Sequence, residues 1–224
     1  MARVRTGETK VPAYYPAFID LRGRRCVVIG AGPVAGRKVT MLLKSGAKVT
    51  VVSPESTAAL ARLAKDGDVE WRRRAYQPGD LSGAWLAIAA TDDAKVNRQI
   101  ADEAEAKHVL LNVVDKPDLC TFIAPSVVQQ GDLTIAISTA GKSPAMARKV
   151  REEMERYFPP EYGVLLDIAG EVREMLMRVP GRLPAELWQQ ALSGEVLDLI
   201  RAGRRDAARD KMVNILRNMR AVAS

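Results

Sequence analysis

The sequence predicts an α/β fold built on a doubly wound parallel sheet. Short apolar segments alternate with helical ones through the first half of the chain. The clearest unit is an apolar run at Cys26–Ile29, a helix over Pro33–Ser45 and a second apolar run at Val49–Val52. Continuous apolar runs of this length are typical of parallel strands that are buried on both faces. The alternation of strands and helices therefore favours a parallel sheet with helices on both sides.

A glycine-rich turn joins the first strand to the first helix. Gly30 and Gly32 are followed by Ala35 and Gly36, which fits the spacing G-x-G-x-x-A. In this motif the first glycine permits a tight turn, and the second lets the backbone approach a pyrophosphate. The small residues behind them let the helix lie close to the strand. Because the motif stands between two apolar strands, we expect a dinucleotide whose phosphates face the free amides of the helix.

The rest of the first half continues the alternation. We expect a helix at Ser56–Lys65, strands at Val69–Arg73 and Trp85–Ala90, a helix from Thr91 to about Lys107 and a strand at Leu110–Val114. The ligand crevice of such a sheet lies at the carboxyl ends of its strands. The residues at those ends should converge in space, and they are Gly30, Ser53, Thr91 and Asp115.

The pattern changes after Asp115. Thr121–Gln130 and Leu133–Ser138 are predicted as two strands of a hairpin, joined through Gly131 and Asp132. Ser143 as N-cap and Pro144 as first helical residue begin a helical region, with breaks near residues 158–160, 179–181 and 202–203. We therefore expect three regions: a dinucleotide-binding domain at 1–114, a hairpin domain at 115–142 that forms a dimer, and a helical domain at 143–224.

Composition limits the classes of function. The 224 residues include 34 Lys and Arg against 27 Asp and Glu, a net charge of +7. This excess fits either an ordinary basic surface or an anionic partner such as a polycarboxylate. Aromatic residues are only 5% and are not interleaved with basic ones, which argues against a nucleic-acid platform. Without an apolar span or a signal peptide, we expect a cytoplasmic protein that does not enter a membrane.

The second strand bears on the choice of dinucleotide. The acid that binds a ribose 2′-hydroxyl usually ends this strand, and here it is displaced to Glu55. No Arg or Lys follows immediately to hold a 2′-phosphate, so the sequence favours NAD over NADP. Glu55 is equally well interpreted as an acid in the first turn of a helix.

Asp115 is the main candidate for chemistry. It follows an apolar strand and precedes Lys116-Pro117. One interpretation is a turn aspartate before a proline. The other is a proton acceptor or donor at the mouth of the crevice, where partial desolvation would raise the pKa of its carboxyl group.

Three other places carry candidate residues. Thr91 is predicted as a helix N-cap, and its backbone is a candidate to line the nicotinamide side of the crevice. The loop Ser138–Ser143, with Lys142, is either a plain capped loop or a site for carboxylates or phosphates. The single histidine, His108, is interpreted as structural, and neither it nor the two cysteines, Cys26 and Cys120, show metal-ligand or disulfide spacing.

Five ordered segments resemble one known family. They are YPAFIDLRGRRCVVIGAGPVAGRK, GAKVTVVSP, WLAIAATDD, NVVDKPDLCTFIAPS and AISTAGKSPAMAR, which together extend from Tyr15 toward Ile168. In them the chain resembles the precorrin-2 dehydrogenase and sirohydrochlorin ferrochelatase family, the NAD-binding part of siroheme synthase. The resemblance implies a Rossmann domain, a small dimerisation domain and a C-terminal helical domain.

The resemblance also implies an activity and its residues. The reaction is NAD-dependent oxidation of precorrin-2 to sirohydrochlorin by a homodimer, with ferrochelation as a further activity of some members. Pro33, Val34, Pro54 and Glu55 match positions that contact NAD, alongside Gly30, Gly32 and Thr91. Asp115 matches the aspartate proposed to act in both reactions. Thr139 stands where some members have serine, and with Gly141, Lys142, Ser143 and Arg148 it forms the expected substrate-binding set.

A different class of function remains open at this stage. A non-catalytic Rossmann protein that senses NAD or NADH and acts through a partner would need neither Asp115 nor a tetrapyrrole pocket. Both the sensor and the enzyme require the same glycine turn.

Overall fold

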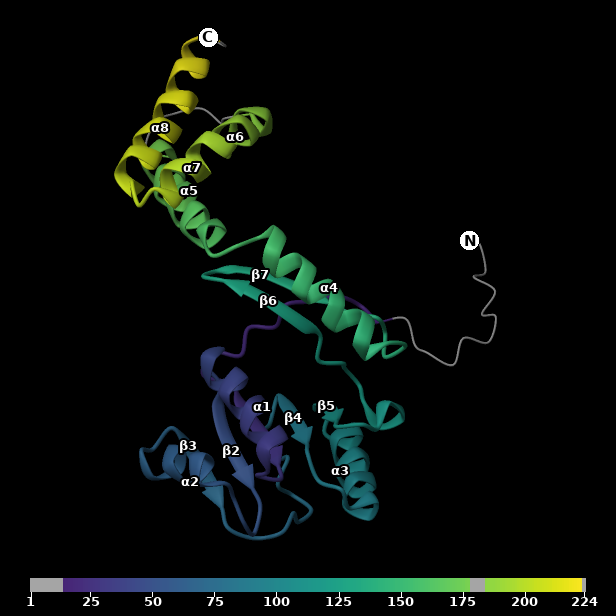
Figure 1. Cartoon of the computed structure of the whole chain (residues 1–224). Helices are drawn as coiled ribbons and strands as arrows, with labels where there is room; N and C mark the ends of the chain where they lie inside the picture. Colours follow the sequence, from purple (N-terminus) through teal and green to yellow (C-terminus); the bar gives the residue numbers. More distant parts are fainter. Residues whose placement is uncertain (1–13, 178–183, 223–224) are drawn as a thin grey trace. The chain divides into compact units, whose positions relative to one another are not determined.

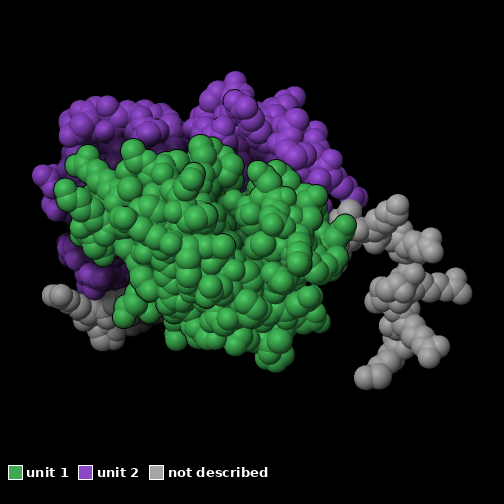
Figure 2. Space-filling view, turned by 90° about the horizontal axis from the view of Figure 1, so that it is seen from below, with its two compact units in different colours: residues 1–124 green, residues 125–224 purple. Residues whose placement is uncertain are grey.

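The computed structural model describes residues 14–177 and 184–222. It divides into two compact units, residues 1–124 and residues 125–224, which are coloured separately in Figure 2. The hairpin and the C-terminal helices fall in the same unit. The division into three domains at 114 and 142 stays a prediction.

The first unit is a parallel five-stranded sheet in the order β3-β2-β1-β4-β5 (Figure 1). Its strands are β1 (Arg25–Ile29), β2 (Lys48–Val52), β3 (Val69–Arg72), β4 (Leu86–Ala89) and β5 (Leu110–Val113). Each neighbouring pair is parallel and in register. The strand order reverses between β1 and β4, which is the place where such sheets bind their ligands. The predicted fold class is confirmed.

Helices pack on both faces of this sheet. The helices are α1 (Pro33–Lys44), α2 (Ala58–Lys65) and α3 (Ala94–Ala106). Because side chains alternate along a strand, Cys26 and Val28 of β1 join the core formed with α1 and α2. Val27 and Ile29 join the other core, formed with α3. Burial also raises the pKa of the Cys26 thiol to about 11.

The outer edge of β5 is closed by the chain that follows it. Leu111 donates its amide to the Thr121 hydroxyl at 2.7 Å, and its carbonyl accepts the Thr121 amide at 2.8 Å. The Val113 amide donates to Cys120 Sγ at 3.2 Å, and the Val113 carbonyl accepts from the Lys116 amide at 3.2 Å. The outward-facing backbone groups at both positions of β5 are therefore satisfied.

The predicted strand at Thr121–Gln130 is wrong in its first half. β6 comprises only Ser126–Gln130. The amides of Thr121 and Phe122 both turn back to the carbonyl of Leu111. Thr121 and Phe122 are β-branched and aromatic residues of the kind that favour strands, but here they pack along the outer edge of β5 instead.

The second unit contains the hairpin and five helices in its described part. The hairpin pairs β6 with β7 (Leu133–Ile137) through Gly131 and Asp132, as predicted, and α4 (Pro144–Tyr157) packs against it (Figure 1). The later helices are α5 (Glu161–Met177), α6 (Ala185–Ala191), α7 (Gly194–Arg201) and α8 (Arg205–Val222). Ile168, Met212 and Leu216 are fully buried among them.

The helix breaks agree with the sequence in two of three places. Helices end before Pro159 and again near Gly203, as predicted. The third predicted break, at 179–181, lies outside the described residues. An additional break separates α6 from α7 at Leu192 and Ser193. None of the helices in the described ranges has the length and apolarity that a bilayer crossing needs.

Candidate active site

The glycine turn lies at the carboxyl end of β1, between the ends of its two neighbours. Gly30 has φ +99, and its amide donates to the carbonyl of Val52 in β2 at 2.9 Å. A Cβ atom on Gly30 would stand 2.3 Å from the carbonyl oxygen of Ala90. Both the backbone angle and the contact require glycine here.

Gly32 has a different role from Gly30. It is the N-cap of α1 with an extended backbone, and no described atom lies within 4 Å of the position that its Cβ would take. No described side chain caps the helix, and its first turn contains no acidic residue. Pro33 is the first helical residue and Val34 the second, so the amides that follow are open to a ligand. An open space in front of uncapped amides fits a pyrophosphate.

The segment after β2 is held against the glycine turn. The Ser53 amide donates to the carbonyl of Arg72 at 3.2 Å, and the Thr57 amide donates to the carbonyl of Ala31 at 3.2 Å. Pro54 and Glu55 lie between these two attachments and are exposed. They are therefore placed where the ribose of a dinucleotide would be expected.

Thr91 lies beside the turn, but it does not cap the next helix. The N-cap of α3 is Asp93, whose carboxylate accepts from the amides of Lys95 at 2.8 Å and Val96 at 3.1 Å. The predicted threonine cap is therefore wrong, because the helix begins only at Ala94, and the Thr91 hydroxyl accepts from the Asp93 amide at 3.3 Å instead. Thr91 is instead fixed through its carbonyl, which accepts from the side-chain amide of Asn97 at 2.9 Å. Asn97 is only 2% exposed, and the sequence analysis missed it.

Asp115 follows β5 at the same edge of the sheet. The Val114 amide donates to the carbonyl of Ala89 at 2.9 Å, so Asp115 and Thr91 each stand just beyond the ends of paired strands. Asp115 has φ +58, a conformation that aspartate and asparagine adopt more readily than most residues. Its side chain is exposed, so protein atoms do not supply the partial desolvation expected from the sequence.

A buried acid organises the chain between β3 and β4. The Asp80 side chain is 3% exposed and forms ion pairs with Arg72 at 3.2 Å and Arg74 at 2.6 Å. Burial acts to raise the pKa of its carboxyl group, but the hydrogen bonds from Arg74, the Gln77 amide and Arg72 outweigh it and hold the pKa below its usual value. The sequence signal for this arrangement is an aspartate after Pro-Gly, preceded by a run of three arginines.

The remaining predicted residues belong to the second unit. Thr139 and Ser143 exchange hydrogen bonds: the Thr139 hydroxyl donates to the Ser143 carbonyl at 3.1 Å and accepts from the Ser143 amide at 3.3 Å. Ala140 and Gly141 both have positive φ, which turns the loop tightly. Ser143 caps α4 by accepting from the Met146 amide at 3.1 Å, as predicted. The loop is thus rigidly built, with the Thr139 hydroxyl holding it together.

The two basic candidates near this loop differ in their partners. Lys142 is exposed and forms no ion pair with a described residue. Arg148 is exposed and pairs with Glu152 one helical turn away, at 2.9 Å. An exposed pair of this kind is weak, so Arg148 could exchange Glu152 for a ligand carboxylate at little cost.

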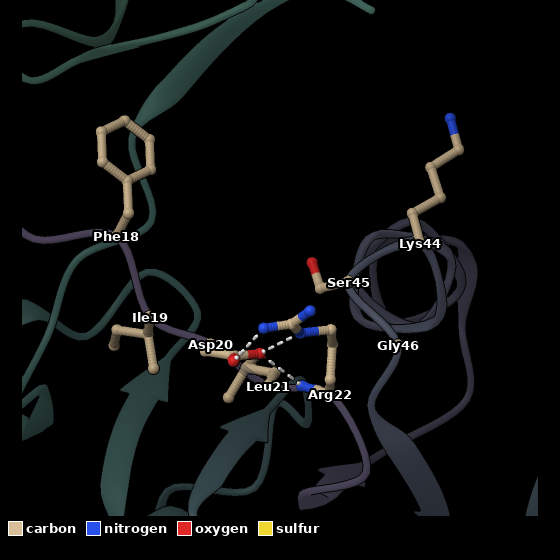
Figure 3. Close-up of a pocket in the computed structure, with 8 residues that line it drawn as sticks. All are labelled: Phe18, Ile19, Asp20, Leu21, Arg22, Lys44, Ser45 and Gly46. Carbon is tan, nitrogen blue, oxygen red and sulfur yellow. Dashed lines mark hydrogen bonds and ion pairs between the residues drawn. The ribbon is translucent and has the colours of Figure 1, made fainter. Parts of the chain in front are cut away.

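A shallow hollow lies at the opposite, amino edge of the sheet (Figure 3). Phe18 and Ile19 are among the residues that line it, Arg22 is held there by Asp20, and Lys44 lies across from them at the end of α1. These residues precede β1 or follow α1, so the hollow is remote from the glycine turn. The glycine turn at the carboxyl edge, and not this hollow, therefore remains the candidate dinucleotide site. In the described ranges, no three His, Cys, Asp or Glu side chains are grouped to hold a metal ion.

Comparison with known proteins agrees with this geometry. A family model described as NAD(P)-binding matches residues 17–126, and one for the central part of a sirohaem biosynthesis protein matches residues 130–157. The siroheme synthase of Methylobacillus flagellatus is 41% identical to this chain over 203 residues. The siroheme synthase of Photorhabdus laumondii is 40% identical over 195 residues. This chain is a relative of the siroheme synthases.

The relationship to the siroheme synthases covers most of this chain and less than half of theirs. The two matches span 90% and 85% of this chain, but 44% and 41% of the relatives. A solved structure described as SirC, precorrin-2 dehydrogenase, has a TM-score of 0.72 over 92% of this chain and 100% of its own, with 23% identity. The match to the solved structure supports the fold. The similarity to the siroheme synthases confirms the predicted family resemblance.

Proposed function

We propose that this chain oxidises precorrin-2 to sirohydrochlorin with a nicotinamide dinucleotide as the oxidant. The observation that carries the proposal is the glycine turn, where Gly30 is closed by Ala90 and Gly32 stands open before uncapped amides. The similarity to siroheme synthases over most of the chain supplies the substrate class.

The coenzyme would lie along the carboxyl edge of the sheet. Its pyrophosphate would be bound by the amides behind Gly32, next to Pro33 and Val34. Pro54 and Glu55 would contact the adenosine ribose, with the Glu55 carboxylate accepting from a ribose hydroxyl of NAD. Thr91, fixed by Asn97, would line the nicotinamide end.

The chemistry needs a hydride acceptor and a proton acceptor. A nicotinamide dinucleotide bound at the glycine turn would supply the hydride acceptor. Asp115 would accept the proton that leaves with the hydride, since its carboxylate is exposed at the end of β5 beside Thr91. The left-handed backbone of Asp115 sets the direction of this side chain.

The proposed substrate carries several carboxylates, which the excess of Lys and Arg in the chain would attract. In the second unit, Lys142 and Arg148 would bind substrate carboxylates, and the loop from Thr139 through Gly141 to Ser143 would present its amides. Lys142 has no ion-pair partner among the described residues, which supports this role.

A spectroscopic assay tests the proposal. Purified protein, precorrin-2 and NAD should give the absorbance of NADH and of sirohydrochlorin together and in equal amounts. A non-catalytic sensor would bind the dinucleotide without either change, and that result would refute the enzyme. Adding ferrous or cobaltous ion with sirohydrochlorin as substrate tests ferrochelation in the same cuvette.

We further propose that the active form is a homodimer. The hairpin β6–β7 is a two-stranded sheet that packs against α4, but Val128 is the one buried residue of its two strands. The partly exposed residues that remain offer a surface that a second copy of the chain could cover. Light scattering at the assay concentration would give twice the chain mass if the proposal is correct, and the monomer mass otherwise. A cytoplasmic location stays a prediction.

A further inference from the structure

We propose that the adenosine end of this site accepts a 2′-phosphate, so that the chain uses NADP as well as NAD, and that Arg73 binds the phosphate. This inference rests on the proposed dinucleotide site and names the coenzymes it takes. It goes beyond the sequence, in which no basic residue follows β2 closely enough to suggest it.

Arg73 is brought to the site by the neighbouring strand. It directly follows Arg72, the last residue of β3, and the Arg72 carbonyl accepts from the Ser53 amide at 3.2 Å. Ser53 is the first residue beyond β2. Arg73 therefore lies next to the Ser53–Glu55 segment, where the 2′ group of the adenosine ribose is bound in this fold.

The side chain of Arg73 is held in place by Trp71. The guanidinium carbon lies 4.3 Å from the centre of the indole ring, in a cation–π arrangement. The indole nitrogen Nε1 in turn donates to the Ser53 carbonyl at 2.9 Å. Trp71 thus links the guanidinium to the segment after β2. Stacking leaves the N–H groups at the edge of the guanidinium plane free to donate.

Arg73 also differs from Arg72 and Arg74 in its ion pairs. Arg72 is paired with Glu70 and Asp80, and Arg74 is paired with Asp80. Within the described residues, no carboxylate lies within ion-pair distance of Arg73. Its charge is therefore available to an anion, and a guanidinium is well matched to a phosphate because it can donate two parallel hydrogen bonds.

The residue that follows Glu55 carries a hydroxyl group without a partner. The Ser56 side-chain oxygen is buried and has no hydrogen-bond partner among the described residues. Buried hydroxyl groups are nearly always partnered, so an unpaired one next to Glu55 indicates a missing acceptor or donor. A phosphate oxygen would accept its hydrogen bond. Glu55 itself is exposed, so it can bind the ribose of NAD and turn to solvent when a phosphate is present.

Binding measurements on the full chain test the proposal without turnover. Calorimetry would compare NAD with NADP, and 5′-AMP with adenosine 2′,5′-bisphosphate. We expect Kd values for NAD and NADP within about tenfold of each other. Arg73→Gln should weaken NADP and the bisphosphate at least about tenfold, the effect of losing a charge-assisted contact, and leave NAD and AMP unchanged. Arg62→Gln, an exposed arginine on α2 that pairs only with Asp66 among the described residues, is the matched control.

The outcomes separate this inference from the proposed function. NADP binding more than about a hundredfold weaker than NAD binding would overturn the inference and leave the enzyme intact. So would an Arg73→Gln variant that binds NADP like the unaltered chain. If neither dinucleotide binds, the proposed function fails first, and this inference fails with it.

Discussion

The carbonyl oxygen of Ala90 occupies the space that a side chain on Gly30 would need, 2.3 Å from its Cβ position. The contact ties the turn after β1 to the turn after β4, at the point where the sheet reverses its strand order. Any residue other than glycine must therefore separate these two turns.

Gly30→Ala should destabilise the first unit as well as weaken coenzyme binding. The substitution combines a φ of +99 with a collision against backbone, so we expect a loss of at least about 2 kcal/mol in the free energy of unfolding. Urea denaturation would measure it. Gly79→Ala is the control: it also has a positive φ but has open space at its Cβ position. Equal losses in both variants would contradict the role of Ala90.

Gly32→Asp should abolish coenzyme binding without destabilising the fold. Aspartate at an N-cap is favourable for α1, so the fold should be kept or slightly stabilised. Its carboxylate would occupy the open amides and repel the pyrophosphate, so calorimetry should detect no coenzyme binding. Gly32→Asn has the same shape without the charge and should bind more tightly than Gly32→Asp. Retained affinity in Gly32→Asp would remove the proposed pyrophosphate site.

Asp115→Asn should lower turnover of precorrin-2 by roughly 10²–10⁴, the usual contribution of a general base. Asparagine accepts a φ of +58, so the fold and the Kd for the coenzyme should not change. Asp118→Asn, three residues on and also exposed, should turn over normally. Near-normal turnover in Asp115→Asn would exclude this residue from the proton transfer.

The ion pairs of Asp80 predict how stability depends on pH. The pKa of Asp80 is held below its unfolded value, so its contribution is complete above about pH 4 and is lost as the pH falls through the lower, folded pKa. Asp80→Asn should cost about 2–4 kcal/mol near pH 7, since two arginines lose a buried partner. Below pH 4 the difference between the two proteins should shrink. Unfolding by urea at several pH values measures both effects, and a constant difference at all pH values would contradict this origin.

Local sequence signals predicted the strands of the first unit to within about a residue at each end. Val49–Val52 and Trp85–Ala90 were recognisable because buried parallel strands are continuously apolar. The start of α3 was predicted wrongly: the pattern indicated Thr91 as the N-cap, whereas the observed hydrogen bonds identify Asp93.

Contacts between strands could not be predicted in the same way. Trp71 and Arg73 are 18 or more residues away from Ser53, and nothing in their own segment indicates that they meet it. The same holds for Asn97, whose partner depends on how α3 follows β4. Gly30, Ser53, Thr91 and Asp115 could be predicted because the carboxyl ends of parallel strands converge, whereas the groups that hold them in place depend on tertiary packing.

The covering of β5 by Thr121 and Cys120 has a consequence for association in solution. A flat sheet with free hydrogen-bonding groups along its border invites strands from other molecules to add to it. Here those groups are already used within the chain. Growth of the sheet into an intermolecular β-ribbon is therefore blocked on that side, so concentrated preparations should not polymerise through it.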